Sequence, residues 1–386
     1  MKVRVGTGVG SVTLLLAVAM ACTSAGAQAA GCTAPKAAVV TITTTTTTPT
    51  VTTTTTTGTT TTGTPTTGIT TTPTTTVTTT TKTKRKPVKA VRATSTTLSL
   101  AGLFTVGKAK VTVPHRSVEI SGRIRPYVAG QRFLVSESVD GSRFKTVKLA
   151  ARCLAGTNTG SFDLKVSAPR PGRVTVKVRH ATTKTMKAFK LQGSFDSLNP
   201  NVGPGATGVF VELLQQRLAA LHLFIPQTGK FDLGTELALD AYHRLLGEGE
   251  GIETLGPKTV TALLDGDGSF HVRFAKQGNH AEGDLSDQLL AFIDDGTKVQ
   301  WIFPISSGKP STPTILGSFQ IYYKEPEYTS DGMYFSSFFH GGYAIHGYNP
   351  APDYPASHGC MRLPMVDAIP AFGWTRVGDW VDTYYT

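Results

Sequence analysis

Between residues 94 and 198, apolar and polar side chains alternate along the chain with a period of two. Residues 174–179 read Val-Thr-Val-Lys-Val-Arg, and residues 162–167 read Phe-Asp-Leu-Lys-Val-Ser. Turn-forming sequences separate such runs, with Asp-Gly-Ser at 140–142 and Pro-Arg-Pro-Gly at 169–172. Successive side chains of a strand point to opposite faces, so these runs predict short, half-buried strands. Their regular spacing predicts an antiparallel β-sandwich over residues 94–198.

The hydrophobic period changes over residues 203–267, where apolar residues recur three and four positions apart. This spacing is typical of one face of an amphipathic helix. It predicts a helix over 209–221, a second one that runs from Thr235 as N-cap to residue 246, and a short third one over 259–264. We therefore expect a small three-helix module here, with a helical linker packed on its neighbour as the alternative.

The first 29 residues have the layout of a secretory signal peptide. Lys2 and Arg4 begin it, an apolar stretch covers 9–21, and small residues follow at 25–29. The apolar stretch is shorter than the roughly 20 residues that a membrane-spanning helix needs. The sequence thus predicts an exported protein in the cell wall or a periplasm-like space. A retained N-terminal anchor and a lipidated cysteine are the alternatives.

Residues 30–93 have neither a helical nor a strand period. Threonine occupies 30 of the 40 positions from 41 to 80, and a run of basic residues follows at 82–92. A segment with nothing large to bury cannot offset the entropy lost on ordering. We expect a disordered Thr-rich and then basic linker, long enough to hold folded domains away from a surface.

Cleavage of the signal would remove Cys22 and leave Cys32, Cys153 and Cys360. Exported proteins form disulfides, and an odd count leaves one thiol without a disulfide partner. Whether Cys32 and Cys153 pair stays open at this point.

The length of 386 residues predicts several domains, and the net charge is +12. That charge is unevenly distributed, because residues 94–200 carry net +13 whereas residues 201–386 carry net −10. The basic part lacks the interleaved aromatic residues on which single-stranded nucleic acid stacks. We therefore expect no nucleic-acid partner. The basic N-terminal half is instead suited to anionic wall polymers or a membrane surface.

Candidate chemistry is concentrated between Tyr343 and Arg362. Cys360 follows Gly359 and has two histidines nearby in sequence, His346 and His358. A thiol becomes a nucleophile when a histidine or a positive potential favours the thiolate. A glycine before it permits a sharp turn that aims backbone N–H groups at one point, as an oxyanion hole requires. This pattern favours a Cys/His nucleophile.

Cys360 has two other interpretations, a structural cysteine and a zinc ligand. A structural buried cysteine rarely sits between a glycine and an arginine with two histidines nearby. A zinc site has suitable ligand types, but the spacing matches no common zinc motif. Such a site would use His340, His346, His358 and Cys360.

The segment Ser-His-Gly-Cys-Met-Arg at 357–362, after Ile-His-Gly at 345–347, resembles the L,D-transpeptidases with a YkuD-type catalytic domain. Residues 288–296 are similar to the opening β-hairpin of that family, and 305–319 to its following strand and loop. The resemblance implies that residues 268–386 form a β-rich catalytic domain.

Two weaker resemblances concern the other modules. Leu-Gln-Gln-Arg-Leu at 214–218, Gly-Lys-Phe-Asp at 229–232 and Gly-Pro-Lys-Thr at 256–259 resemble the three-helix peptidoglycan-binding module. The 94–198 pattern is similar to the immunoglobulin-like spacer modules of bacterial surface proteins. The fold class is therefore expected to be multidomain and mostly β.

The resemblance also implies roles for single residues. Cys360 attacks a peptide carbonyl, His346 is the general base, and the carbonyl of Gly347 orients it. The N–H groups of Gly359 and Cys360 hold the oxyanion, and no metal or organic cofactor is required. The residues implied to contact substrate are Ser357, His358, Arg362, Tyr343 and Tyr334. Those lying where the family has a lid are Tyr334, Phe335, Phe338 and Phe339.

The function implied is an exported transpeptidase. It would form 3→3 cross-links between peptidoglycan stem peptides, donor and acceptor, with release of D-alanine. Two alternatives remain at this stage: an L,D-carboxypeptidase that uses water as the acceptor, and a wall-binding protein without activity.

Overall fold

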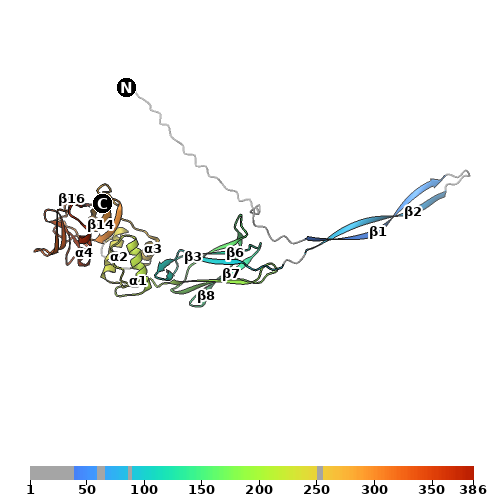
Figure 1. The fold of residues 1–386 in the computed structure, drawn as a ribbon, viewed down its shortest axis with the longest axis horizontal. Helices are drawn as coiled ribbons and strands as arrows, with labels where there is room; N and C mark the ends of the chain where they lie inside the picture. The colour runs from blue at the N-terminus through green and yellow to red at the C-terminus, as the bar shows by residue number, and fades with distance from the viewer. Residues whose placement is uncertain (1–38, 59–65, 86–88, 250–254) are drawn as a thin grey trace, which may run out of the picture.

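The structure is a computed structural model that describes residues 39–58, 66–85, 89–249 and 255–386 (Figure 1). The predicted signal peptide and Cys32 lie outside the described residues. Cys153 is disulfide-bonded, whereas Cys360 carries a free thiol. Within the described ranges, no helix is both long enough and apolar enough to cross a membrane.

The Thr-rich region forms a long two-stranded hairpin, at the blue end of Figure 1. Strand β1 (Val39–Gly58) pairs antiparallel with β2 (Thr66–Arg85). Here the structure differs from the expectation of a linker without regular structure. The physical reason is that threonine is β-branched and favours extended backbone, a preference that outweighs the absence of a hydrophobic period.

Two packed sheets follow and form a β-sandwich. The first sheet has the spatial order β3 (Ser95–Ala101), β6 (Val118–Arg125), β10 (Gly160–Val166), β9 (Arg152–Cys153). The second has the order β4 (Phe104–Val106), β5 (Ala109–Thr112), β12 (Phe189–Ser197), β11 (Gly172–His180), β7 (Arg132–Val139), β8 (Ser142–Ala150). All pairs are antiparallel except β5 with β12.

The alternating positions bury the face that the sequence pattern predicts. In β11, Val174, Val176 and Val178 are fully buried, and Lys177 and Arg179, which alternate with them, are exposed. Phe133 and Phe162 from the two sheets meet in this core with ring centroids 5.1 Å apart. The strand pattern is thus confirmed, while the likeness to immunoglobulin modules stays a prediction.

Three helices come next: α1 (Val209–Ala220), α2 (Leu233–Leu245) and α3 (Pro257–Asp265). The N-cap of α2 is Asp232 and not Thr235, because the Asp232 carboxylate accepts the Thr235 N–H at 3.1 Å. Gln215, the first glutamine of the Leu-Gln-Gln-Arg-Leu sequence at 214–218, is buried and has a structural role. Its side chain accepts the Gly229 N–H at 2.8 Å and donates to the Lys230 carbonyl at 2.9 Å. Binding of peptidoglycan by these helices stays a prediction.

The C-terminal region contains two sheets and one helix. The first sheet has the order β15 (Lys298–Pro304), β14 (Leu289–Asp294), β13 (His280–Asp284), β21 (Trp380–Tyr384), β16 (Gly317–Gln320). The second has the order β17 (Tyr323–Tyr328), β18 (Tyr334–His340), β19 (Tyr343–Gly347), β20 (Met361–Leu363). Helix α4 (Met365–Trp374) follows β20 directly. Strands β14 and β15 pair antiparallel, as the predicted opening hairpin requires.

The modules are joined by shared hydrophobic cores. Leu214 and Tyr242 of the helices pack in one cluster with Leu289 and Ile302 of the C-terminal sheet. A separate cluster joins strands β4 and β5 of the sandwich to α1 and α3. Sandwich, helices and C-terminal sheets therefore follow one another along the long axis in Figure 1.

Candidate active site

Two neighbouring strands bring the predicted catalytic residues together. His346 of β19 lies opposite Arg362 of β20 in a parallel pair, so their side chains share one face of the sheet. Cys360 directly precedes β20, and the N–H of Ala344 stabilises its thiolate form by a hydrogen bond. Ala344 is two residues before His346 on the same strand. The pairing therefore holds the thiol segment beside the histidine strand.

Ser357 fixes the turn that carries the thiol. Its buried hydroxyl donates to the Cys360 carbonyl at 2.6 Å and accepts the Gly359 N–H at 3.0 Å. The Gly359 N–H is thus engaged inside the turn. This differs from the expected oxyanion role of Gly359, because the Ser357 hydroxyl, two residues earlier in the turn, competes for that donor. Ser357 is buried and shapes the loop, and its contact with substrate stays a prediction.

Glycine is required at position 359. Its φ is +125°, a region that L side chains rarely adopt. A Cβ there would also lie 2.4 Å from the ring of Tyr343. Tyr343 therefore covers the turn, and the sharp backbone path predicted before Cys360 is present.

A third segment anchors the turn from the other side. Ser306 exchanges backbone hydrogen bonds with Arg362 at 2.9 and 3.0 Å, and the Ser357 N–H donates to the Ser307 carbonyl at 2.9 Å. Lys309 Nζ lies 3.2 Å from Nε2 of His358, on the exposed side of the loop. This contact places the predicted His358 beside a cation at the entrance to the site.

Gln288 is a supporting residue that the sequence analysis missed. Its buried side chain donates to Ser307 Oγ at 2.7 Å and accepts the Ser307 N–H at 2.8 Å. The only sequence signal was a polar residue at the start of an apolar run, and that pattern has no specific meaning without the fold.

The histidine is held in one tautomer by its neighbour. Nδ1 of His346 lies 2.9 Å from the Gly347 carbonyl oxygen. Because a carbonyl only accepts, Nδ1 carries the proton and Nε2 keeps its lone pair. Burial and the charge of Arg362 together lower the pKa of His346 to about 4, against the opposing effect of the Gly347 bond. The imidazole is therefore neutral at physiological pH.

The thiol is also neutral in the free protein. Burial raises the pKa of Cys360, while the Ala344 N–H and the charge of Arg362 lower it in part. The Cys360 thiol donates a hydrogen bond to the Gly342 carbonyl at 3.4 Å. A neutral acid and a neutral base thus lie on neighbouring segments, the protonation states from which a thiol can transfer its proton to an imidazole.

Arg362 is oriented by an aromatic ring. Its guanidinium lies over Tyr348, 4.0 Å from the ring centroid, and Nη1 lies 3.5 Å from the Ala356 carbonyl. Its buried Nε finds no hydrogen-bond partner among the described residues. In this structure Arg362 supplies positive potential next to His346 and Cys360.

The predicted lid residues belong to a paired strand. Strand β18 lies between β17 and β19, and Phe339 is buried in the core. Tyr334 lies opposite Gly347, where an added Cβ would meet Tyr334 at 3.3 Å and Ala368 at 2.6 Å. The position of these aromatics at a lid over the cleft stays a prediction.

No three His, Cys, Asp or Glu side chains are grouped to hold a metal in the described part of the chain. The alternative zinc site, with His340, His346, His358 and Cys360 as ligands, is thus not formed there.

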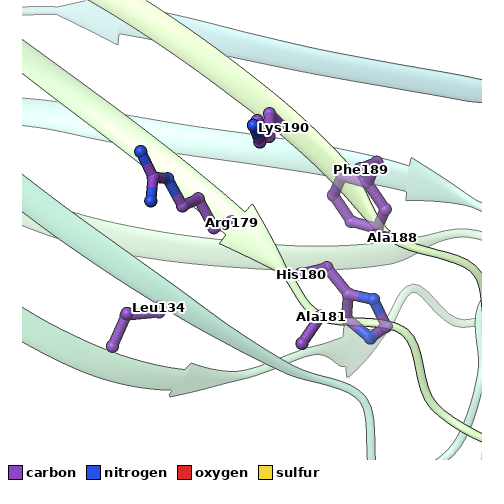
Figure 2. A pocket seen from close by; sticks show the side chains of 7 residues that line it. All are labelled: Leu134, Arg179, His180, Ala181, Ala188, Phe189 and Lys190. Atoms are coloured by element: carbon purple, nitrogen blue, oxygen red, sulfur yellow. The ribbon is translucent and has the colours of Figure 1, made fainter.

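A hollow of about 630 Å³ lies on the surface of the sandwich, and Figure 2 shows the side chains that line it. Its walls include Leu134, Phe189 and buried His180, with Arg179 and Lys190 at its edge. None of the residues of the nucleophile turn lines it.

The strands that carry Cys360 and His346 lie inside a stretch that matches a known family. Residues 278–382 match the YkuD family, described as the L,D-transpeptidase catalytic domain. The match starts just before β13 and ends within β21, so both C-terminal sheets are included. These sheets therefore form a catalytic domain of the transpeptidase class. Specifically, residues 278–382 are a YkuD-type L,D-transpeptidase domain.

Solved structures resemble part of the chain. An L,D-transpeptidase from Xylanimonas cellulosilytica is 31% identical, with 47% of this chain and 97% of that chain covered and a TM-score of 0.43. An L,D-transpeptidase from Stackebrandtia nassauensis is 21% identical, with 48% and 96% covered and a TM-score of 0.32. Among curated proteins, none matches this chain.

Proposed function

We propose that the protein is an exported, cysteine-dependent L,D-transpeptidase that forms 3→3 cross-links in peptidoglycan. The observation that carries this proposal is the orientation of His346. The Gly347 carbonyl holds Nδ1–H at 2.9 Å, so Nε2 is the base on the face shared with the thiol segment. The family match of residues 278–382 supports the same reaction class.

In the acylation step, Cys360 Sγ attacks the carbonyl of the third residue of a tetrapeptide stem. The thiol proton passes to Nε2 of His346, and the new C–S bond gives a tetrahedral oxyanion. The C–N bond to the terminal D-alanine then breaks. His346 returns the proton to the leaving amine, and a thioester remains.

In the second step, a side-chain amine of another stem attacks the thioester carbonyl. His346 takes a proton from this amine, and Cys360 leaves as the thiol. The N–H of Cys360 stabilises the oxyanion, since the Gly359 N–H is engaged by Ser357 at 3.0 Å. Tyr343, which covers the turn, and His358, at its entrance, are the residues we assign to stem contact, with Tyr334 at the Gly347 end.

The remaining modules deliver this domain to its substrate. We assign peptidoglycan binding to the helices of residues 203–267 and contact with anionic wall polymers or a membrane surface to the basic N-terminal half. Export follows from the signal-like first 29 residues. The sandwich over 94–198 acts as a basic spacer.

A product assay tests the proposal. The protein is incubated with a disaccharide tetrapeptide, and the products are identified by mass spectrometry, with Cys360→Ala as control. Cross-linked dimers with loss of one D-alanine per dimer are expected. Trimmed tripeptide without dimers would mean that water is the acceptor and the enzyme is a carboxypeptidase. If no substrate is converted, the protein is instead a wall-binding protein without activity.

A further inference from the structure

A cavity of about 250 Å³ lies at the junction between the helical module and the catalytic domain. Phe224, Pro226 and Val366 form apolar parts of its wall. Two carboxyl groups also line it: Asp232, the N-cap of α2, and Asp367, in the first turn of α4. Neither group takes part in the reaction proposed above.

Asp367 has no partner that explains its burial. Its relative exposure is 4%, and neither a hydrogen bond nor a neighbouring charge counters the effect of burial on the pKa of its carboxyl. Burial raises its pKa to about 7. A buried carboxyl without a partner is costly and is usually explained by a missing ligand, ion or water.

Asp232 adds a permanent negative charge to the same cavity. Burial opposes ionisation, but hydrogen bonds from Thr228 and Thr235 lower its pKa overall. Both carboxylate oxygens of Asp232 are engaged by these threonines, so it contributes charge and leaves Asp367 to contact the ligand.

These features fit a cation with an apolar stem. The N-termini of α2 and α4 would favour an anion by their dipoles, but the wall of this cavity carries two acidic residues, Asp232 and Asp367, which disfavour one. A primary ammonium on an alkyl chain places its methylenes against Phe224, Pro226 and Val366. Ionised Asp367 then accepts its hydrogen bonds.

We propose that this junction cavity is a binding site for an aminoalkyl group, with Asp367 as the ammonium acceptor and Asp232 as the supporting charge. The proposal rests on the proposed function, because peptidoglycan stems with a side-chain amine supply such a group. The site would hold a stem against both modules at once.

The test uses the full chain as the Cys360→Ala variant, so that no turnover occurs. The probes are Nα-acetyl-lysine amide and the neutral Nα-acetyl-norleucine amide, titrated at pH 7.5 with binding followed by calorimetry. The lysine probe should bind at least about tenfold more tightly than the norleucine probe, a difference of roughly 1.4 kcal/mol. Equal binding of the two probes, or binding of neither, overturns the proposal.

Asp367→Asn keeps the shape and removes the charge, and it should weaken the lysine probe about tenfold or more. Asp232→Ser retains an N-cap hydroxyl and should weaken it by a smaller factor. The matched control is Asp331→Asn, which changes the same charge at an exposed turn and should leave binding unchanged. If Asp367→Asn binds as tightly as the parent, the site is wrong.

The outcome is separable from the transpeptidase proposal. If the lysine probe does not bind, the binding-site proposal fails. Dimer formation by the enzyme with Cys360 intact still tests the transpeptidase proposal separately. Binding of the probe by a chain that forms no dimers would reject the reaction and retain the site.

Discussion

His346 and Cys360 are neutral in the free protein because His346 is buried and Cys360 is partly buried. This pair therefore differs from one in which an ordinary histidine, with a pKa near 6.5, sits beside an exposed thiol. The difference has a direct consequence for how the acylation rate depends on pH.

A plot of the Cys360 acylation rate against pH should show no inflection near pH 6.5. Burial lowers the pKa of His346 to about 4, so the base form persists down to that pH and is lost only below it. Burial raises the pKa of Cys360, so the rate of direct thiolate reaction rises only at alkaline pH. Single-turnover acylation by a carbapenem, measured as protein mass against pH, checks this. Circular dichroism at each pH provides the control, and an acid limb between pH 6 and 7 in folded protein would contradict it.

Asp367 should make the stability of the catalytic domain fall as pH rises. Its pKa is raised from 3.8 to about 7, so the folded state holds a proton that the unfolded state releases between pH 4 and 7. The destabilisation is complete above pH 7 and absent at pH 4. Asp367→Asn should therefore stabilise the domain by roughly 2 to 4 kcal/mol at pH 8 and by much less at pH 4. Urea unfolding at the two pH values measures this, and an equal effect at both would contradict the prediction.

The sequence predicted part of the site at the residue scale. Cys360, His346 and Gly359 were identifiable because their residue types and spacing have a chemical meaning. The Gly359 N–H was assigned to the oxyanion, but the Ser357 hydroxyl accepts it. Asp367 and Gln288 gave no signal, because their significance depends on which segments the fold places around them.

At the scale of the elements, the side chain of Arg244 connects helix α2 to the catalytic domain by hydrogen bonds. Arg244 Nη1 donates to the Gln288 carbonyl at 2.9 Å and to the Ile305 carbonyl at 3.3 Å. Nη2 donates to the Asp353 carbonyl at 3.3 Å and pairs with Asp240. These carbonyls belong to three segments that converge on the Ser357 turn.

Arg244→Met should destabilise the protein by about 3 to 5 kcal/mol, because it removes these donors and takes the arginine away from the buried Asp240. Adding Asp240→Asn should recover part of that stability, because it removes the negative charge that Arg244 balanced. Activity should stay low in both variants, because the carbonyl contacts are absent. Urea unfolding and dimer formation are the two measurements. Parent-like activity in the double variant would show that Arg244 only supports stability.

The elements were predictable where local pattern decides them. Period-two runs gave the sandwich strands, and helical spacing gave α1 and α2 within a few residues. The start of α2 was misassigned because Asp232 and Thr235 both suit an N-cap, and the Asp232 contact decides between them. Strand β18 carries the aromatics that the family resemblance places at a lid, and its pairing with β17 and β19 could not be predicted from those side chains alone.

At the scale of the whole molecule, charge and packing divide the chain differently. Shared cores join the sandwich to the helices and the helices to the catalytic domain. Net charge instead distinguishes the sandwich from the rest. Residues 94–200 carry net +13, whereas residues 201–386, which include the helices and the catalytic domain, carry net −10. The basic part is thus connected to an acidic catalytic part through packed hydrophobic cores.

Binding of the full chain to isolated sacculi should weaken as salt concentration rises. Exposed charges are screened beyond about 8 Å at physiological ionic strength, so contact between the basic sandwich and anionic wall polymers is salt-dependent. Reversal of the exposed charges at Lys177 and Arg179 on β11 should weaken binding at low salt and have little effect at high salt. Pull-down across a salt series measures both effects. Binding that is independent of salt would assign wall attachment to the helices alone.

The central claim is that Cys360 carries the acyl group between two stems. The most direct measurement is the intact mass of the protein after brief exposure to a tetrapeptide donor without acceptor, followed by peptide mapping. We predict a mass increase equal to the donor less D-alanine, located on Cys360 and absent from Cys360→Ala. The same adduct on the Cys360→Ala variant, or D-alanine release without any adduct on Cys360 at the shortest times, would contradict the account.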